Sequence, residues 1–261
     1  MADVVSAFQS WWGDLVRQNP PGWIEAFGVT ILEVVISTVV GVFCYATSRD
    51  KGYREMVRGS AGLVSFNLVL RTLSHILMLQ IYAWLCGDGA SWQNVAFTRV
   101  SAEVPSVRKL LTQFALAICI FDVLFYSWHR MLHSPRLYRK IHSVHHTFEH
   151  RSKHRVPLAV YYVHPIEMLL LEMSVHLSCS LQGAHVLTYL FSGTMALLMA
   201  LYGHSGRDLF GLMSHEHHHV RESKNYGATG MMDFLWGSFE SRKAGKGPYM
   251  RVELCLRNEA S

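Results

Sequence analysis

Long apolar runs are the feature that most restricts what this chain can fold into. A helix needs about 20 mostly apolar residues to cross the hydrocarbon core of a bilayer. Runs of roughly this length stand at residues 24–46, 61–86, 110–128, 165–181 and 184–203. The fourth run is short for a full span, and the gap of two residues after it predicts a tight helical hairpin with the fifth. We therefore predict an all-α integral-membrane bundle of four or five apolar helices.

The charge content of the chain also favours a membrane setting. Half of the 261 residues are hydrophobic and 16% are charged, whereas soluble domains average about 25% charged residues. The basic residues behind the net charge of +5 are scattered among polar loops and form no nucleic-acid-binding motif. We expect this excess charge at the lipid headgroups rather than on a nucleic acid.

The charges of the connecting segments predict an orientation. The link 48–60 carries four basic residues, whereas the link 87–106 carries only Arg99. The positive-inside rule then places the first link in the cytosol and the second on the opposite side. The third span returns to the cytosolic side at Trp128, where a histidine-rich region begins. This order predicts a cytosolic, histidine-rich helical cap on the bundle.

The chain divides by composition into three parts. Residues 1–109 are predicted to form an N-terminal membrane segment, with two spans behind an interfacial helix that carries Phe8, Trp11 and Trp12. Residues 110–240 are predicted to form one region that holds the histidine-rich segment, and residues 241–261 a polar tail.

Histidines supply the main chemical signal. Fifteen of the sixteen fall between residues 129 and 219, and three boxes repeat the same spacing: His129 and His133; His142, His145 and His146; His215, His218 and His219. Residues three and four apart share one face of a helix, so each box is expected to aim its imidazoles at one point. Together the boxes offer more nitrogen ligands than one tetrahedral zinc ion can use. This surplus predicts a two-metal centre.

Further motifs follow the boxes in order. They are Val163-His164-Pro165-Ile166-Glu167, His204-Ser205-Gly206, Asn225-Tyr226-Gly227 and Asp233-Phe234-Leu235-Trp236-Gly237-Ser238. With the boxes, this ordered set resembles the fatty acid hydroxylase/sterol desaturase superfamily of membrane di-iron lipid oxidases, over about residues 110–240. The pattern is most similar to the branch that contains C4-methylsterol oxidases and sterol desaturases. Ala200 departs from it, because some hydroxylases have a histidine four residues before the equivalent of His204.

The resemblance implies a ligand set and a reaction. The implied metal ligands are His129, His133, His142, His145, His146, His204, His215, His218 and His219. They imply two iron ions per chain, with O2 as co-substrate, that hydroxylate or desaturate a sterol or a fatty acyl or sphingoid chain. The resemblance further implies cytochrome b5 and its NAD(P)H reductase as electron donor, and a multi-pass location in the endoplasmic reticulum membrane with the active site facing the cytosol.

Three carboxylates are candidates to orient the ligand rings. Asp122 lies two helical turns before His129 on the same face, and a carboxylate often accepts a hydrogen bond from the second ring nitrogen of a ligand histidine. Pairing with Arg71 is the alternative for Asp122. Asp233 and Glu167 are candidates for the same role. The alternative for Asp233 is a helix cap, and the alternative for Glu167 is a charge in the first turn of a helix.

The remaining histidines are predicted to lie outside the metal shell. His164 precedes Pro165 and is expected to begin a helix, and His217 points away from the face of its box. His75, His176 and His185 stand alone in apolar runs and are expected to be packed or to have their polar atoms satisfied. Met195, Met199 and Met213 are expected to pack the core or a lipid slot.

Two other functions remain open from the sequence. A zinc-binding membrane carrier or sensor would also use histidine clusters, but it is expected to place ligands along a path through the bilayer. A zinc-dependent lipid hydrolase would need an open coordination position and a general base, for which Glu216 is the candidate within a box.

Overall fold

The computed structural model describes residues 2–47, 51–86, 91–146, 157–205 and 215–240. Its elements in chain order are α1 (Ala2–Gln18), α2 (Pro21–Thr47), α3 (Lys51–Cys86), the 3-10 turn η1 (Trp92–Asn94), α4 (Val107–Leu132), α5 (Pro135–Leu137), the π-helical turn η2 (Tyr138–His142), the 3-10 turn η3 (Pro157–Tyr161), α7 (Pro165–Ser180), α8 (Val186–Gly203), α9 (His215–Val220) and α10 (Met231–Leu235). Within these ranges there is no β-strand, and the predicted all-α class is confirmed. The residues 241–261 that we assigned to a polar tail lie outside this description, and the division into three parts stays a prediction.

Among the described residues, four helices are long and apolar enough to cross a membrane. Their candidate spans are Pro21–Phe43, Ala61–Leu85, Val107–Leu132 and Val186–Gly203. The predicted integral-membrane helical bundle is confirmed, and four of its described helices are candidate spans. The apolar run 165–181 forms α7, which has only 16 residues and is therefore about 24 Å long. That length is shorter than the roughly 30 Å hydrocarbon core of a bilayer.

The bundle faces lipid with rows of apolar side chains. Val35 and Val39 on α2 are 54% and 62% exposed, and Leu73 and Leu77 on α3 are 59% and 58% exposed. In each pair the residues lie four apart and share one helix face. Large exposed apolar surfaces are rare on soluble monomers, so these rows are the surface that the bilayer covers.

The interior of the bundle holds a buried ion cluster. Arg71 of α3 is 2% exposed and pairs with both Glu33 of α2 and Glu172 of α7. A buried charge is costly unless it is paired, and the two carboxylates supply the partners of this guanidinium. The alternative in which Asp122 pairs with Arg71 is therefore wrong.

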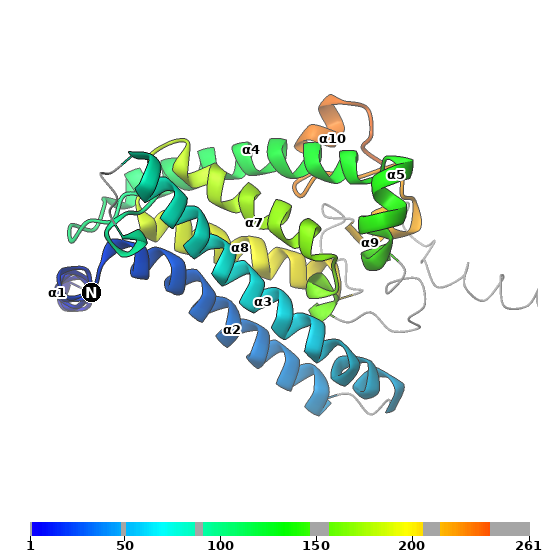
Figure 1. The fold of residues 1–261 in the computed structure, drawn as a ribbon, viewed down its shortest axis with the longest axis horizontal. Coiled ribbons are helices and arrows are strands. Elements are labelled where there is room, and N and C mark those ends of the chain that lie inside the picture. Colours follow the sequence, from blue (N-terminus) through cyan, green and yellow to red (C-terminus); the bar gives the residue numbers. More distant parts are fainter. Residues whose placement is uncertain (1, 48–50, 87–90, 147–156, 206–214, 241–261) are drawn as a thin grey trace, which may run out of the picture.

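The elements place the histidines at one end of the bundle (Figure 1). The helices α2 and α3 lie side by side, α7 and α8 form the predicted hairpin above them, and α4 packs across α7. Gly183 permits the tight hairpin turn because its φ of 59° is left-handed. The short helices α5, α9 and α10 gather near the end of α4, whereas α1 lies at the opposite end (Figure 1).

Candidate metal centre

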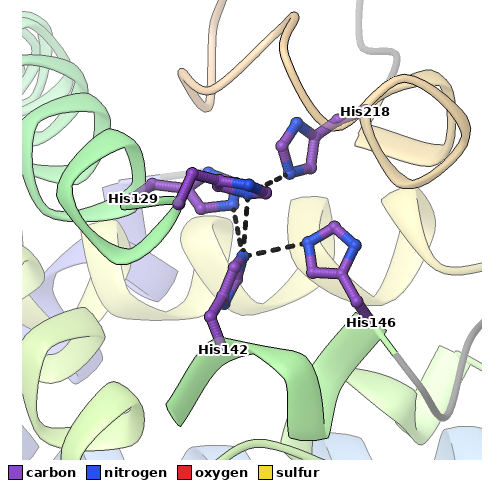
Figure 2. Close-up of side chains that lie close together, drawn as sticks. His129, His142, His146 and His218 are labelled. Atoms are coloured by element: carbon purple, nitrogen blue, oxygen red, sulfur yellow. Dashed lines mark hydrogen bonds between the residues drawn. The ribbon is translucent and has the colours of Figure 1, made fainter. Parts of the chain in front are cut away.

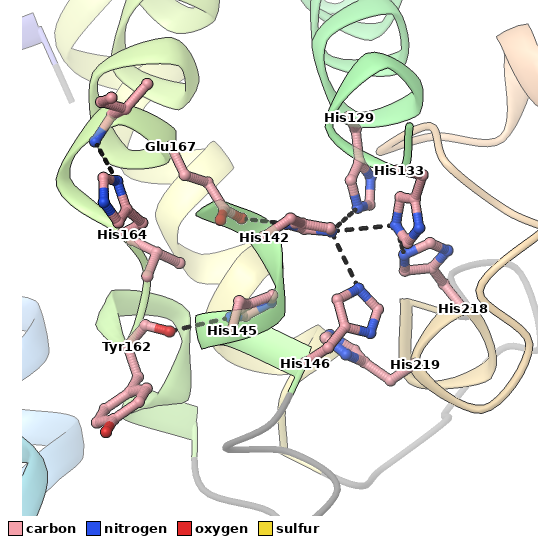
Figure 3. Close-up of polar contacts among 12 residues, drawn as sticks. His129, His133, His142, His145, His146, Tyr162, His164, Glu167, His218 and His219 are labelled. Carbon is pink, nitrogen blue, oxygen red and sulfur yellow. Dashed lines mark hydrogen bonds and ion pairs between the residues drawn. The ribbon is translucent and has the colours of Figure 1, made fainter. Parts of the chain in front are cut away.

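The nine histidines that the resemblance implies as ligands lie in two compact groups. The first histidine group contains His129, His133, His142, His146 and His218, and the second contains His145, His204, His215 and His219. Within each group, one nitrogen from every ring lies within 4.8 Å of the others. The groups are neighbours, since the rings of His146 and His219 are only 4.5 Å apart between centroids (Figure 3).

The boxes are shared between the two groups, which corrects the expectation that each box aims at one point. His142 and His146 lie in the first group, whereas His145 lies in the second. His215 and His219 lie in the second group, whereas His218 lies in the first. Residues four apart thus stay together, whereas the middle residue of each three-histidine box, His145 or His218, turns to the neighbouring group. Adjacent positions on one helical turn point in different directions.

Local structure explains how the rings reach these positions. The long helix α4 buries Asp122, Tyr126 and His129 on one face and ends with His133 as its C-cap. Pro135 then starts the short helix α5. The π-helical turn η2 follows directly and ends at His142. Such turns insert an extra residue into a helix and are frequent at functional sites.

His142 lies at the centre of the first group (Figure 2). Its Nε2 atom has three imidazole neighbours: the Nε2 atoms of His129 at 3.2 Å, His133 at 3.0 Å and His146 at 3.0 Å. A neutral imidazole has one donor and one acceptor nitrogen, so hydrogen bonding cannot satisfy all of these contacts. Nitrogen ligands at about 2.0–2.1 Å from a metal ion lie about 3.0–3.4 Å from one another. The nitrogens of this group therefore have the spacing of ligands around one shared cation.

The second group has a similar geometry. Nε2 of His215 is 3.1 Å from Nε2 of His219. His204, the C-cap of α8, has its ring centroid 4.7 Å from that of His215 and 5.0 Å from that of His145. Helices α8 and α9 and the turn after η2 thus bring four rings to one point. This group also fits a cation.

The outer ring nitrogens are held by the surrounding chain (Figure 3). Nδ1 of His142 donates to the carboxylate of Glu167 at 2.8 Å. The other Nδ1 atoms donate to backbone carbonyls: His129 to Tyr226 at 2.7 Å, His218 to Lys224 at 2.7 Å and His145 to Tyr162 at 3.3 Å. Such contacts fix the tautomer and leave Nε2 free to ligate. The three carbonyls had no signal in the sequence, because a backbone acceptor depends on no residue type.

The two aspartates act on the loop beside His129. Asp122 accepts hydrogen bonds from the backbone amides of Thr229 and Met232 at 2.7 and 2.9 Å. Asp233 accepts from the amides of Tyr226 and Gly227 at 2.8 and 2.6 Å. The sequence predicted that these carboxylates bond directly to an imidazole, but their partners are backbone amides. Of the three candidate carboxylates, Glu167 makes the direct contact.

Burial keeps the histidines of this centre neutral. Burial, with the nearby His129, lowers the pKa of His133 to about 3. Burial also lowers the pKa of His218 well below its usual range, and the charges of neighbouring imidazoles add to the effect. Metal coordination requires neutral imidazole. His133 and His218 are therefore in their ligating form at neutral pH.

Several other residues lie outside the two groups. His164 caps the N-terminus of α7 by accepting from the amide of Ile166, as expected, and His217 lies 3.5 Å from a carboxylate oxygen of Glu240. The side chain of Glu216 and all of Met213 lie outside the described part of the chain. His75 and His176 are packed, as expected: their ring centroids are 4.7 Å apart, and Nε2 of His75 lies 3.2 Å from Oε1 of Glu25.

An apolar cavity of about 290 Å³ leads to the histidines. Its walls come mostly from α4, α7 and α8, and include Phe121, Phe125, Leu171, Met195 and Met199. Along α4 it extends from Phe114 to His129, a distance of about 22 Å. The cavity ends on rings of both groups, among them those of His142 and His204. A long apolar molecule in it would meet the histidines with one end.

Comparison with known proteins supports this description. The fatty acid hydroxylase family matches residues 114–238. The chain is 33% identical to human fatty acid hydroxylase domain-containing protein 2, over 54% of this chain and 44% of the relative. It is 30% identical to methylsterol monooxygenase 2-2 of Arabidopsis thaliana, over 54% and 57% of the two chains. It is also 30% identical to the Delta(7)-sterol 5(6)-desaturase of Saccharomyces cerevisiae, over 55% and 40%.

These matches concern one part of the molecule. The chain spans about half the length of the curated relatives it matches, and no solved structure matches it. The matched residues hold both histidine groups, the two aspartates and most of the cavity wall. Residues 114–238 are therefore the part of this chain that is similar to the fatty acid hydroxylase family.

Proposed function

We propose that the chain is a membrane-bound di-iron oxidase that uses O2 to hydroxylate or desaturate a lipid. The first histidine group would hold one iron ion and the second group the other. Imidazole suits iron, zinc and copper alike, and the relatives named as a monooxygenase and a desaturase favour iron. When bound, the two ions would supply O2 activation and the redox equivalents for removing hydrogen from an unactivated C–H bond.

The observation that carries this proposal is the end of the apolar cavity on the histidines. Phe121, Phe125 and Leu171 exclude water and hold the chain of a lipid, while His142 and His204 lie where that chain stops. Glu167 keeps the proton of His142 on Nδ1 and so aims its Nε2 inward. This arrangement supports oxidation of a lipid better than zinc transport, because both groups lie at one end of the bundle (Figure 1).

The setting of the enzyme is part of the proposal. We place the active site on the cytosolic face of the endoplasmic reticulum membrane, with cytochrome b5 and its reductase as electron donor. Residues 1–109 would anchor and cover the catalytic region 110–240. The four candidate spans and the sterol-oxidising relatives support this setting.

Two neighbouring histidines allow a sharp test of the metal assignment. His145 and His146 are adjacent in sequence but lie in different groups. Full-length protein purified in detergent should contain about two irons per chain, and His145→Ala and His146→Ala should each lose iron and O2-dependent turnover. His217→Ala is the matched control, because His217 lies in box three but faces Glu240, and it should keep both ions. Full turnover by iron-free protein, or turnover without O2, would reject the proposal.

The lipid itself is best found in cells. Deletion of the gene should remove a hydroxylated or unsaturated lipid and raise its reduced precursor in a whole-lipid profile. Reintroducing the natural chain should restore the product, whereas the His146→Ala chain should not. An unchanged profile would count against an oxidase.

A further inference from the structure

A second kind of ligand cluster lies in the bundle away from the histidine groups. Glu25 of α2, His75 of α3 and His176 of α7 meet with one potential ligand atom each within 4.8 Å of the others. Their side chains are almost fully buried, with residue exposures of 0%, 2% and 4%. Along α7, His176 stands nine residues from Glu167 of the histidine centre, which corresponds to about 14 Å. The cluster is therefore a separate site.

The donor atoms are spaced as metal ligands are. Oε1 of Glu25 is 3.2 Å from Nε2 of His75 and 3.9 Å from Nε2 of His176. Ligands at about 2.0–2.1 Å from a tetrahedral ion lie about 3.4 Å apart, and the two distances fall on either side of this value. Two histidines and one glutamate are also the protein ligands of well-known zinc sites that keep one coordination position open.

The surroundings hold Glu25 in place for this role. The backbone N–H and the hydroxyl of Thr98 both donate to Oε2, and the N–H of Phe97 donates to Oε1 at 3.2 Å. Outer contacts of this kind orient the ligating carboxylate in metal sites. One oxygen of Glu25 is thereby anchored, and the other faces the two imidazoles.

His176 adds an independent observation. Both of its ring nitrogens are buried, and neither has a hydrogen-bond partner among the described residues. A buried polar atom without a partner costs about 1–3 kcal/mol, and such atoms in a native structure often mark a ligand or ion. A cation beside Nε2 would satisfy that nitrogen.

The charge balance of the bundle points the same way. Three buried carboxylates, those of Glu25, Glu33 and Glu172, accompany the single buried guanidinium of Arg71. His176 interacts electrostatically with both Glu25 and Glu172. With neutral histidines, these three carboxylates and the guanidinium of Arg71 carry a formal charge of −2, which is costly in an apolar interior. One divalent cation cancels it.

We propose that Glu25, His75 and His176 bind a structural divalent cation of the zinc class. The ion would tie α2, α3 and α7 to the segment at Phe97 and Thr98, close to the end of the bundle that is opposite the histidine groups (Figure 1). Because it uses none of the nine histidines, this proposal does not depend on the proposed lipid oxidation.

Zinc analysis of the full-length protein tests the site. The protein is purified in detergent, dialysed against zinc, and measured for zinc per chain and for melting temperature. His176→Ala and Glu25→Gln should each bind about one zinc less than the natural chain and lose the corresponding thermal stabilisation. The matched control is Glu33→Gln. Glu33 is a buried carboxylate that pairs with Arg71 and is not one of the three ligands, so this variant should keep the ion. Equal zinc content in the natural chain and in both ligand variants would overturn the proposal.

A spectroscopic variant covers the case in which the alanine variant does not fold. His176→Cys places a thiolate at the same position, and cobalt replaces zinc as the added ion. A thiolate-to-cobalt charge-transfer band in the near ultraviolet is expected, because neither of the described cysteine side chains, those of Cys119 and Cys179, is among the ligands of this cluster. The same protein without the cysteine substitution provides the baseline. Absence of the additional band would show that residue 176 does not bind the ion.

Iron loss in the His145→Ala and His146→Ala variants is measured separately, so the proposed oxidase function and the proposed cation site can fail independently.

Discussion

A single peptide unit connects Asp233 to His129. The N–H of Gly227 donates to Oδ2 of Asp233 at 2.6 Å, and the carbonyl of Tyr226, in the same peptide plane, accepts from Nδ1 of His129 at 2.7 Å. Hydrogen bonds in a chain polarise one another, so the carboxylate strengthens this carbonyl as an acceptor. Asp233 thereby supports the tautomer and the basicity of His129 without touching it.

Asp233→Asn should weaken metal binding at the first histidine group. The loss of charge reduces polarisation of the Tyr226 carbonyl, and outer contacts of this type are worth about 10- to 100-fold in metal affinity. Competition with a chelator of known affinity measures the change. Glu240→Gln serves as control, because Glu240 pairs with Arg221 on the surface. An affinity equal to that of the natural chain would show that the peptide contact has no influence.

Gly227→Ala should disturb the same loop by steric overlap. An added Cβ would lie 2.8 Å from Oδ2 of Asp233 and 3.2 Å from Oδ1 of Asp122, and overpacking of this kind costs about 1–3 kcal/mol. A lower melting temperature together with a lower metal content is expected. Gly62→Ala is the comparison, since a Cβ there meets nothing within 4 Å. Equal behaviour of the two variants would contradict the close packing around Gly227.

Ala196→Phe should block the apolar cavity. Ala196 lines it from α8, so a phenyl ring occupies the path of a long lipid and costs about 1–3 kcal/mol of binding, roughly tenfold or more in affinity. Turnover of the cellular substrate should fall while the metal content stays unchanged. On the same helix, Leu198 is 40% exposed, and Leu198→Phe should retain turnover. Undiminished activity of the Ala196 variant would exclude this cavity as the lipid site.

Acid should destabilise the metal-free protein. The pKa of His133 is about 3 in the fold because of burial, whereas an unfolded histidine titrates near 6.5. Between these values the unfolded chain binds more protons than the folded chain, so stability falls as the pH is lowered from about 6.5 towards 3. Melting temperatures of the apoprotein from pH 7 to pH 4 measure this trend, and His133→Gln should make it less steep. A melting temperature independent of pH would show that His133 is not held neutral by the fold.

The long helices could be predicted from the sequence because a helix that crosses a membrane needs one long apolar segment. The apolar runs 24–46, 61–86 and 110–128 became α2, α3 and α4, since each is long enough to satisfy the bilayer by itself. The run 165–181 was harder to interpret. It contains Glu167, Glu172 and His176, whose partners lie on other helices and cannot be seen along one segment.

The histidines of the site could be predicted from the sequence, but their assignment to the two groups could not. Box spacing identified the nine histidines that gather in the two groups, yet it could not assign His145 and His146 to different groups. That division depends on the direction of each Cβ on a turn that follows a π-helical segment. The cluster at Glu25 was missed because its three members are separated by 50 and 101 residues. Only tertiary packing brings such residues together.

The shared boxes have an evolutionary consequence. One helical turn contributes ligands to both groups, because His145 and His146 lie in different groups. A second turn does the same with His218 and His219. An insertion or deletion of a single residue in either turn rotates ligands out of both groups at once. A one-residue insertion or deletion in either turn therefore cannot remove one group and leave the other intact.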